Sequence, residues 1–247
     1  MNNTSMAFLL TFLAGLSTMI GTIFIGKKNS NNVILSSLSF AAGVMICVSI
    51  TDLIPESILL ISDNLHSIPT ILISFLGVVL GIIISMLIDY YLPDSDKSNN
   101  KLYRVGFISM IAIIIHNIPE GIATFMATNN DISLGLSLAL AIAMHNIPEG
   151  ISISVPIYYS TSSKKKALLY TGISALSEPF GALLAYLFLK NIMNDLILGI
   201  LFSVIAGIML QISFSELLPS ARRYNDNKRL IIFFIIGILF MLIKFLL

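Results

Sequence analysis

The sequence predicts an all-α integral membrane protein with eight transmembrane helices. Hydrophobic residues make up 56% of the 247 residues and charged residues only 11%, whereas about 25% of the residues in a soluble domain are charged. The apolar residues form blocks of roughly 18 to 25, the length at which an α-helix crosses a hydrocarbon core of about 30 Å. Two blocks contain the same six residues, HNIPEG, at 116–121 and 145–150. Ionisable residues inside a membrane helix are expensive, so they indicate a functional site.

Short polar clusters bound each predicted helix, because charged and turn-forming residues are unfavourable in hydrocarbon. In chain order these clusters read GKKNSNN, SDNLHS, PDSDKSNNK, TNND, STSSKKK, KNIMND and PSARRYNDNK. The eight predicted spans are 6–26, 33–55, 69–92, 105–127, 133–158, 167–190, 196–218 and 230–246. The start MNNTSMAFLL has no basic residue, so we expect its apolar run to remain as a helix rather than to be a signal peptide. The loops are short, and we expect a single polytopic membrane domain over residues 1–247.

The basic residues predict the orientation of these helices. The loops after the first, third, fifth and seventh spans contain twelve of the 14 Lys and Arg residues, and the exceptions are Lys190 and Lys244. Loops rich in Lys and Arg remain in the cytoplasm, so both termini are expected on the outer side. The expected location is the cell membrane, either a plasma membrane or an inner membrane.

A second repeat relates two other spans. Residues 40–57, FAAGVMICVSITDLIPES, resemble residues 204–221, VIAGIMLQISFSELLPSA, in a register that aligns Asp52 with Glu216. The first copy runs outward and the second inward, as in the inverted-topology repeats of transporters with sites near the bilayer midplane. We therefore expect a 3+2+3 arrangement, in which spans one to three and six to eight are related and spans four and five form a central pair. A chance similarity of composition is the alternative.

The two hexapeptides place ionisable residues near the middle of the bilayer. A charged side chain at this depth costs about 2.5–3.5 kcal/mol on insertion scales, and this applies to Glu120, Glu149 and Glu178, the last being midway along the sixth span. No Lys or Arg occupies the middle of a predicted span, so bound cations or protons must supply the positive charge. A hydrogen-bonded His–Glu pair could explain one copy, but two copies and a third acid favour a shared site.

The spacing within HNIPEG favours metal binding. Its His, Asn and Glu are three or four residues apart and share one helix face. The proline lacks an N–H and is expected to kink the helix and free carbonyls, as Pro179 is expected to break the sixth span, while the glycine lets backbones approach. Imidazole with carboxylate suits Zn²⁺, Fe²⁺, Mn²⁺ or Co²⁺ better than Ca²⁺ or Mg²⁺, and the motif has no sulfur ligand for Cu⁺. The candidate ligands are His116, Asn117, Glu120, His145, Asn146, Glu149 and Glu178.

With these residues, the chain resembles the ZIP (Zrt/Irt-like) family of divalent metal transporters, and within it the bacterial ZupT-type zinc uptake subfamily. The resemblance covers essentially the whole chain and includes eight spans, outer termini and HNIPEG in spans four and five. It implies uptake of Zn²⁺, and often of other divalent metals, into the cytoplasm through a two-metal site.

The same resemblance implies a ligand set for each metal. The first metal would bind Glu120, His145 and Glu149, and His116 matches a position that contributes to it in some members. Glu120 and Glu149 would bridge the two metals. The second metal would bind Asn117, Glu120, Asn146, Glu149 and Glu178. One departure from the family is the loop PDSDKSNNKLYR, which has no histidine where many members carry a His-rich stretch.

Four further acids lie toward the ends of predicted spans. Asp52 and Glu56 are expected near the outer surface, and Asp89 and Glu216 near the cytoplasmic surface. They could attract cations where the transport path begins and ends, or they could simply be solvated.

Our leading hypothesis is metal uptake by alternating access. Zn²⁺ is the expected cargo, with Fe²⁺, Mn²⁺ and Co²⁺ as further candidates, and no resident cofactor is expected. The expected partners are the lipid bilayer and the metal, without nucleic acid, and a homodimer is one option for the assembly. A channel or an exporter with the same ligands is the alternative. We expect no enzyme activity, because an intramembrane metalloprotease would require His-Glu-x-x-His, whereas residues 117 and 120 are Asn and Glu.

Overall fold

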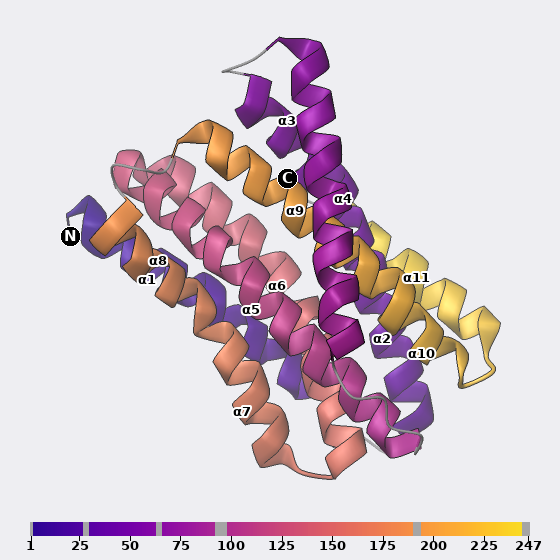
Figure 1. Ribbon diagram of the computed structural model, residues 1–247. Helices are drawn as coiled ribbons and strands as arrows, with labels where there is room; N and C mark the ends of the chain where they lie inside the picture. The colour runs from indigo at the N-terminus through magenta and orange to yellow at the C-terminus, as the bar shows by residue number, and fades with distance from the viewer. Residues whose placement is uncertain (1, 27–29, 63–65, 92–97, 190–193, 244–247) are drawn as a thin grey trace.

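A computed structural model describes residues 2–26, 30–62, 66–91, 98–189 and 194–243, and these residues contain helices and no strand (Figure 1). The first four predicted spans correspond to α1 (Asn3–Ser17) with η1 (Thr18–Phe24), α2 (Ser30–Val48) with η2 (Ser49–Leu53) and α3 (Ile54–Ser62), α4 (Ser67–Tyr91), and α5 (Ser98–Asn130). The last four correspond to α6 (Ile132–Thr161), α7 (Lys164–Ala175) with α8 (Ser177–Leu184) and η3 (Ala185–Leu189), α9 (Asp195–Ile212) with η4 (Ser213–Leu217) and α10 (Leu218–Arg222), and α11 (Asn227–Leu242).

The predicted all-α membrane fold is confirmed. Within the described residues, seven helical stretches are long and apolar enough to cross a membrane. The eighth predicted span corresponds to α11, which has 16 residues, and its predicted end at 244–246 lies outside the described residues. The predicted span ends at 92 and 190, and the basic residues Lys190 and Lys244, also lie outside them.

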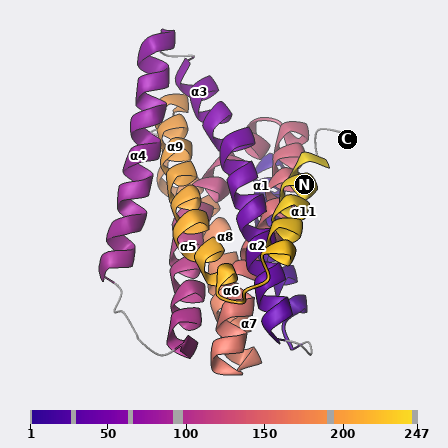
Figure 2. The same cartoon turned by 90° about the vertical axis from the view of Figure 1, so that its right-hand side faces the viewer.

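The two hexapeptide helices form the middle of the bundle. α5 and α6 pack against each other, with α1, α7 and α8 on one side and α2, α4, α9 and α11 on the other (Figure 1). α2 packs along α11, and α4 packs along α9. Figure 2 shows α4 at one edge of the bundle, where its side chains Leu72, Phe75 and Leu76 are exposed. Lipid tails are as apolar as leucine, so we expect this edge to face the bilayer.

Both ends of the described chain lie at the same end of the bundle. Asn3 Nδ2 donates to the backbone oxygen of Asn129 at 3.2 Å, so α1 begins beside the end of α5. Met241, near the end of α11, lines a cavity together with Asn130. Figure 2 shows the start of α1 and the end of α11 on the side of α3, away from α7. This arrangement agrees with the predicted outer position of both termini.

The inverted repeat is visible as two matching irregularities. Asp52 lies in η2 and Glu216 in η4, and both segments are π-helical turns within otherwise α-helical spans. Each turn is followed by a proline in the first turn of the next helix, Pro55 in α3 and Pro219 in α10. A proline is tolerated there because the first turn does not use its N–H. The second and seventh spans extend beyond their predicted ends at 55 and 218, and Asp52 and Glu216 lie within the spans rather than at their ends.

Glycines place the two halves of the repeat in equivalent packing. Each of four glycines faces a backbone carbonyl of the adjacent span so closely that an added Cβ would collide with it. Only glycine permits such an approach. The glycine and carbonyl pairs are Gly43 with Phe234, Gly207 with Val78, Gly237 with Phe40, and Gly81 with Val204. In the repeat, the pair Gly43 and Phe234 corresponds to the pair Gly207 and Val78. The pair Gly237 and Phe40 likewise corresponds to the pair Gly81 and Val204. Spans two and eight therefore pack against each other as spans seven and three do.

Candidate metal centre

The prolines of the two hexapeptides lie inside continuous helices. α5 continues through Pro119 and α6 through Pro148, so neither helix ends there. The break expected in the sixth span occurs three residues ahead of Pro179, at Leu176 between α7 and α8. In a membrane bundle, neighbouring helices can satisfy the backbone groups that a proline releases, and helical structure can therefore persist.

The glycines of the hexapeptides bring neighbouring backbones close, as predicted. A Cβ at Gly121 would collide with the carbonyl of Glu178 at the start of α8. A Cβ at Gly150 would collide with the carbonyl of Thr18 at the start of η1. The first and sixth spans are thus held directly beside the residues that follow Glu120 and Glu149.

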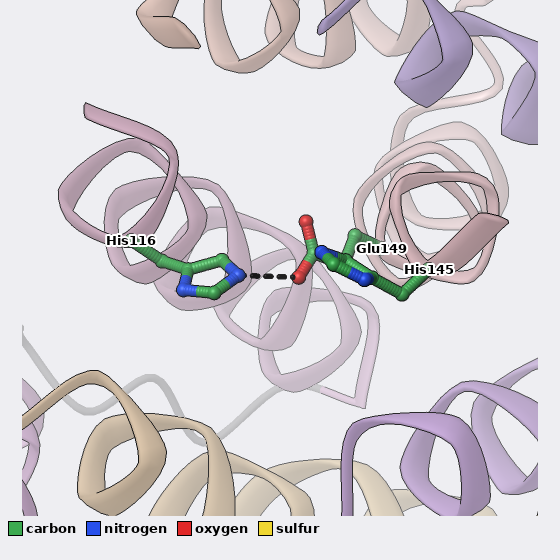
Figure 3. Close-up of side chains that lie close together, drawn as sticks. All are labelled: His116, His145 and Glu149. Atoms are coloured by element: carbon green, nitrogen blue, oxygen red, sulfur yellow. Dashed lines mark ion pairs between the residues drawn. The ribbon is translucent and has the colours of Figure 1, made fainter. Parts of the chain in front are cut away.

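The histidines and glutamates of the two copies meet across the interface between α5 and α6. His145 Nε2 lies 3.1 Å from Glu120 Oε1, and His116 Nε2 lies 3.2 Å from Glu149 Oε1. His116 Nε2 is also 3.3 Å from Glu120 Oε1 on its own helix. Figure 3 shows His116 pointing from α5 toward Glu149, with His145 beside that carboxylate. Each histidine therefore contacts the glutamate of the other copy, and the two copies form one cluster.

The two asparagines connect this cluster to the first and sixth spans. Asn146 Nδ2 donates to Glu178 Oε1 on α8 and, at 2.9 Å, to the backbone oxygen of Ala14 on α1. Asn117 Nδ2 donates to the backbone oxygen of Ser174 on α7 at 3.4 Å. The structure thus brings together all seven candidate ligands predicted from the sequence, and none of them is more than 6% exposed.

Many polar atoms of the cluster have no hydrogen-bond partner among the described residues. The unpartnered atoms are Nδ1 and Nε2 of His116, Oδ1 of Asn117 and of Asn146, both carboxylate oxygens of Glu149, and Oε2 of Glu178. His116 Nε2 and Glu149 Oε1 are close without being aligned as a hydrogen bond. Buried polar atoms of this kind cost free energy unless something binds them. No Lys or Arg in the described part of the chain is buried, so the surrounding helices supply no fixed counter-charge.

The geometry of the cluster suits a divalent cation. His116, His145 and Glu149 each offer a ligand atom, and these atoms lie within 4.8 Å of one another. Two ligands that are each 2.0–2.1 Å from a tetrahedral Zn²⁺ lie about 3.3 Å apart, which is close to the nitrogen–oxygen separations in this cluster. Imidazole nitrogen with carboxylate oxygen also matches the donor preference of Zn²⁺ and related metals.

A cavity of about 570 Å³ reaches the cluster from the outer end of the bundle. Glu120 and His145 line this cavity, and so do Asp52 and Glu56, the acids predicted near the outer surface. Asp195 at the start of α9 also lines it. Asp195 was not predicted as a site residue from the sequence. The sequence did contain a signal for it, because Asp195, like Glu56, is an acid at the predicted outer end of a span. We refer to this space, lined by Asp52, Glu56, Asp195, Glu120 and His145, as the outer cavity.

On the cytoplasmic side, the two predicted acids are joined by an arginine. Arg104 Nη2 lies 2.5 Å from Asp89 Oδ1 and donates to the backbone oxygen of Asp89 at 2.8 Å. Arg104 Nη1 lies 3.6 Å from Glu216 Oε1. This ion-pair cluster ties the start of α5 to α4 and to η4. We call Arg104, Asp89 and Glu216 the inner ion-pair cluster.

Comparison with known proteins gives a consistent result. The family model described as "ZIP Zinc transporter" matches residues 92–244. The zinc transporter ZupT of Clostridium perfringens is 43% identical over 100% of this chain and 97% of the relative. The proteins of the same name from Streptococcus mutans and Chlorobium chlorochromatii are 42% and 40% identical over 98% and 100% of this chain, and over 97% and 98% of the relatives. With its apolar helices, the chain is a multi-pass protein of the cell membrane, and it belongs to the ZIP zinc transporter family.

Proposed function

We propose that this chain carries Zn²⁺ across the cell membrane into the cytoplasm. The observation that carries the proposal is the cluster of buried, unpartnered nitrogen and oxygen atoms, with no buried Lys or Arg among the described residues to balance its carboxylates. The relatives are named zinc transporters, and the donor set suits Zn²⁺. Fe²⁺, Mn²⁺ and Co²⁺ have related preferences and are further candidates for the cargo. The metal is the substrate of transport rather than a resident cofactor.

We further propose that the cluster holds two metal ions. Glu120, His145 and Glu149, together with His116, form the part in which imidazole and carboxylate groups meet. Asn117, Asn146 and Glu178 extend the cluster toward the first and sixth spans. Glu120 and Glu149 lie between the two parts and would bridge the ions. The three carboxylates carry a formal charge of −3. One divalent cation leaves a net charge of −1, and two divalent cations leave a net charge of +1.

The chain is proposed to work by alternating access, with the structure representing an outward-open state. The outer cavity gives Glu120 and His145 access to the outer end of the bundle. The inner ion-pair cluster joins three spans at the cytoplasmic end. Separation of Arg104 from its two acids would open the way to the cytoplasm. An inside-negative potential favours inward movement by about 2.3 kcal/mol per charge per 100 mV, or about 4.6 kcal/mol for a divalent ion.

The whole chain is proposed to act as one transporter domain, since the first and last spans pack directly on the spans that carry the cluster or on their neighbours. A homodimer is compatible with the exposed apolar face of α4, which lipid alone also explains. We propose transport rather than catalysis, because the hexapeptides have asparagine where His-Glu-x-x-His has its glutamate base.

Transport measurements distinguish this proposal from a channel or an exporter. Zinc-starved cells that produce the chain are expected to accumulate radioactive zinc, whereas an exporter would lower their zinc content. In proteoliposomes, unlabelled Zn²⁺ on the far side should accelerate uptake of the radioactive ion, because a carrier returns faster when loaded. A channel would show no such acceleration.

The outer acids are expected to attract the cation. Replacing Asp52 by Asn and Glu56 by Gln removes two negative charges from the outer cavity. Clefts of one charge sign raise the local concentration of counter-ions, so the KM for Zn²⁺ should rise by roughly threefold to tenfold at low salt while kcat changes little. Added salt screens such charges, and the difference between variant and wild type should therefore shrink as salt is raised. An unchanged KM at low salt would show that these acids are merely solvated.

The inner ion-pair cluster is expected to hold the cytoplasmic side closed. Replacing Arg104 by Gln removes two ion pairs and a charged hydrogen bond to the backbone of Asp89, and a hydrogen bond of that kind is worth about 1.5–3 kcal/mol. Backbone amides of residues 85–91 and 101–108 should then exchange hydrogen faster, by about tenfold or more. The matched control is Arg229→Gln, since Arg229 pairs locally at the start of α11, with Asp226 at 3.5 Å. Equal exchange in wild type and Arg104→Gln would contradict a closing role.

A further inference from the structure

The first and sixth spans share a register that assigns a counterpart to Glu178. Residues 11–24, TFLAGLSTMIGTIF, align with residues 171–184, TGISALSEPFGALL. Thr, Leu, Ser and Gly coincide at four places, in Thr11 and Thr171, Leu16 and Leu176, Ser17 and Ser177, and Gly21 and Gly181. In this register Thr18 occupies the place of Glu178.

The side-chain contacts of the two spans follow the same register. Ser17 Oγ donates to the backbone oxygen of Ala14 at 2.6 Å, and Ser177 Oγ donates to that of Ser174 at 2.5 Å. The same two carbonyls accept the hexapeptide asparagines, Ala14 from Asn146 and Ser174 from Asn117. The first span therefore packs on α6 as the sixth span packs on α5.

The backbone of Thr18 lies directly beside the residue that follows Glu149 of the cluster. The carbonyl of Thr18 abuts Gly150, the residue after Glu149, just as the carbonyl of Glu178 abuts Gly121, the residue after Glu120. Since Glu178 reaches Asn146 of the cluster from this position, the pseudo-twofold relation predicts that the Thr18 side chain points toward Asn117. Asn117 Oδ1 has no hydrogen-bond partner among the described residues.

The hydroxyl of Thr18 differs from its neighbours in having no partner. Thr18 is 0% exposed, and its Oγ1 makes no hydrogen bond within the described part of the chain. Along the same span, Thr11, Ser17 and Thr22 all donate to carbonyls of their own helix. Buried hydroxyls usually find such a partner, so the hydroxyl of Thr18 is available for a ligand.

We propose that Thr18 Oγ1 is a neutral oxygen ligand of the cation site, opposite Glu178 across the pseudo-twofold axis. This inference rests on the proposed function, because the ligand is the transported divalent cation. The first span then contributes the neutral hydroxyl of Thr18 to the site, and the sixth span contributes the carboxylate of Glu178. Together the two spans add only one negative charge to those of Glu120 and Glu149. A carboxylate at both places would raise the negative charge of a site that must also release its ion.

The test measures Zn²⁺ affinity of the purified full chain in detergent, by competition with a zinc indicator. Thr18→Val keeps the side-chain volume and removes the hydroxyl, and it should weaken Zn²⁺ binding about tenfold, at the lower end of the 10–100-fold losses seen when groups that support metal ligands are removed. Thr18→Ser restores the hydroxyl and should bind nearly as tightly as wild type. Rescue by serine but not by valine separates a ligand from a packing role.

A matched control is Thr171→Val. Thr171 is also 0% exposed and its Oγ1 also lacks a partner among the described residues, but it lies two turns before Glu178 and should leave Zn²⁺ affinity unchanged. Equal affinity of Thr18→Val and wild type, or equal losses in Thr18→Val and Thr171→Val, would overturn the role of Thr18. Absence of Zn²⁺ binding by wild type would instead overturn the proposed function, and the role of Thr18 with it.

Discussion

Replacing Glu120 and Glu149 together by glutamine is expected to abolish saturable Zn²⁺ transport in a protein that still folds. Both carboxylates are buried and each lies within 3.3 Å of a histidine of the cluster. Loss of groups that only support metal ligands already costs 10–100-fold in affinity, so loss of two proposed direct ligands should lower Zn²⁺ affinity by more than about 100-fold. Competition binding and proteoliposome uptake would measure the two effects.

Stability provides a second measure of the same variant. Each uncompensated charge at mid-bilayer costs about 2.5–3.5 kcal/mol, so the metal-free double variant should melt at a higher temperature than metal-free wild type. Zn²⁺ should raise the Tm of wild type, since a ligand at 100 times its Kd stabilises by about 2.7 kcal/mol, and should not raise that of the variant. Asp226→Asn is the matched control, because this acid lies at the start of α11 and pairs with Arg229. Normal uptake by the double variant would rule out the assignment of these ligands.

Replacing Gly121 or Gly150 by alanine is expected to lower the yield and the Tm of the folded protein. At both positions the added Cβ would collide with backbone, the carbonyl of Glu178 or that of Thr18, and backbone cannot rotate away as a side chain can. Overpacking usually costs about 1–3 kcal/mol, and the forced separation would also move Glu178 or Thr18 away from the cluster. Thermal unfolding in detergent and Zn²⁺ affinity would measure these two consequences.

Gly172→Ala is the control for this prediction. The nearest atom to a Cβ at Gly172 is the sulfur of Met19 at 3.7 Å, an ordinary contact, and the residue lies within α7. Alanine is favoured over glycine in a helix interior by up to about 1 kcal/mol, so Gly172→Ala should keep or raise the Tm. If Gly121→Ala and Gly150→Ala behaved like Gly172→Ala, the close approach of the first and sixth spans to the cluster would be wrong.

The sequence predicts the cluster because its members are polar or ionisable residues within apolar membrane spans. A histidine, an amide and a carboxylate in the middle of an apolar span carry a clear signal, and two identical hexapeptides predict that their copies meet. The acid Glu178 is recognisable for the same reason. Polar and ionisable residues are expensive in hydrocarbon, so their positions in the sequence alone identify most of the cluster.

Other features depend on tertiary packing and have no local signal. Thr18 is a small hydroxyl residue in an apolar span, where such residues are common, and its contact with Gly150 and the missing hydrogen-bond partner of its buried hydroxyl among the described residues appear only in the folded chain. In the sequence, Arg104 indicates only which side of the membrane its loop occupies. Its ion pairs with Asp89 and Glu216 form only in the folded chain. The prolines of the hexapeptides lie inside α5 and α6, which continue through them, and the local sequence does not determine whether a proline ends a helix or lies within it.

The central claim is that the two hexapeptides form one metal centre rather than two separate polar pairs. The most direct test is anomalous diffraction at the zinc edge from crystals of the full chain grown with Zn²⁺. We predict two peaks between α5 and α6, one beside His116 and His145 and one beside Glu178. Peaks confined to the outer cavity or the chain surface, with none between the hexapeptides, would contradict this claim.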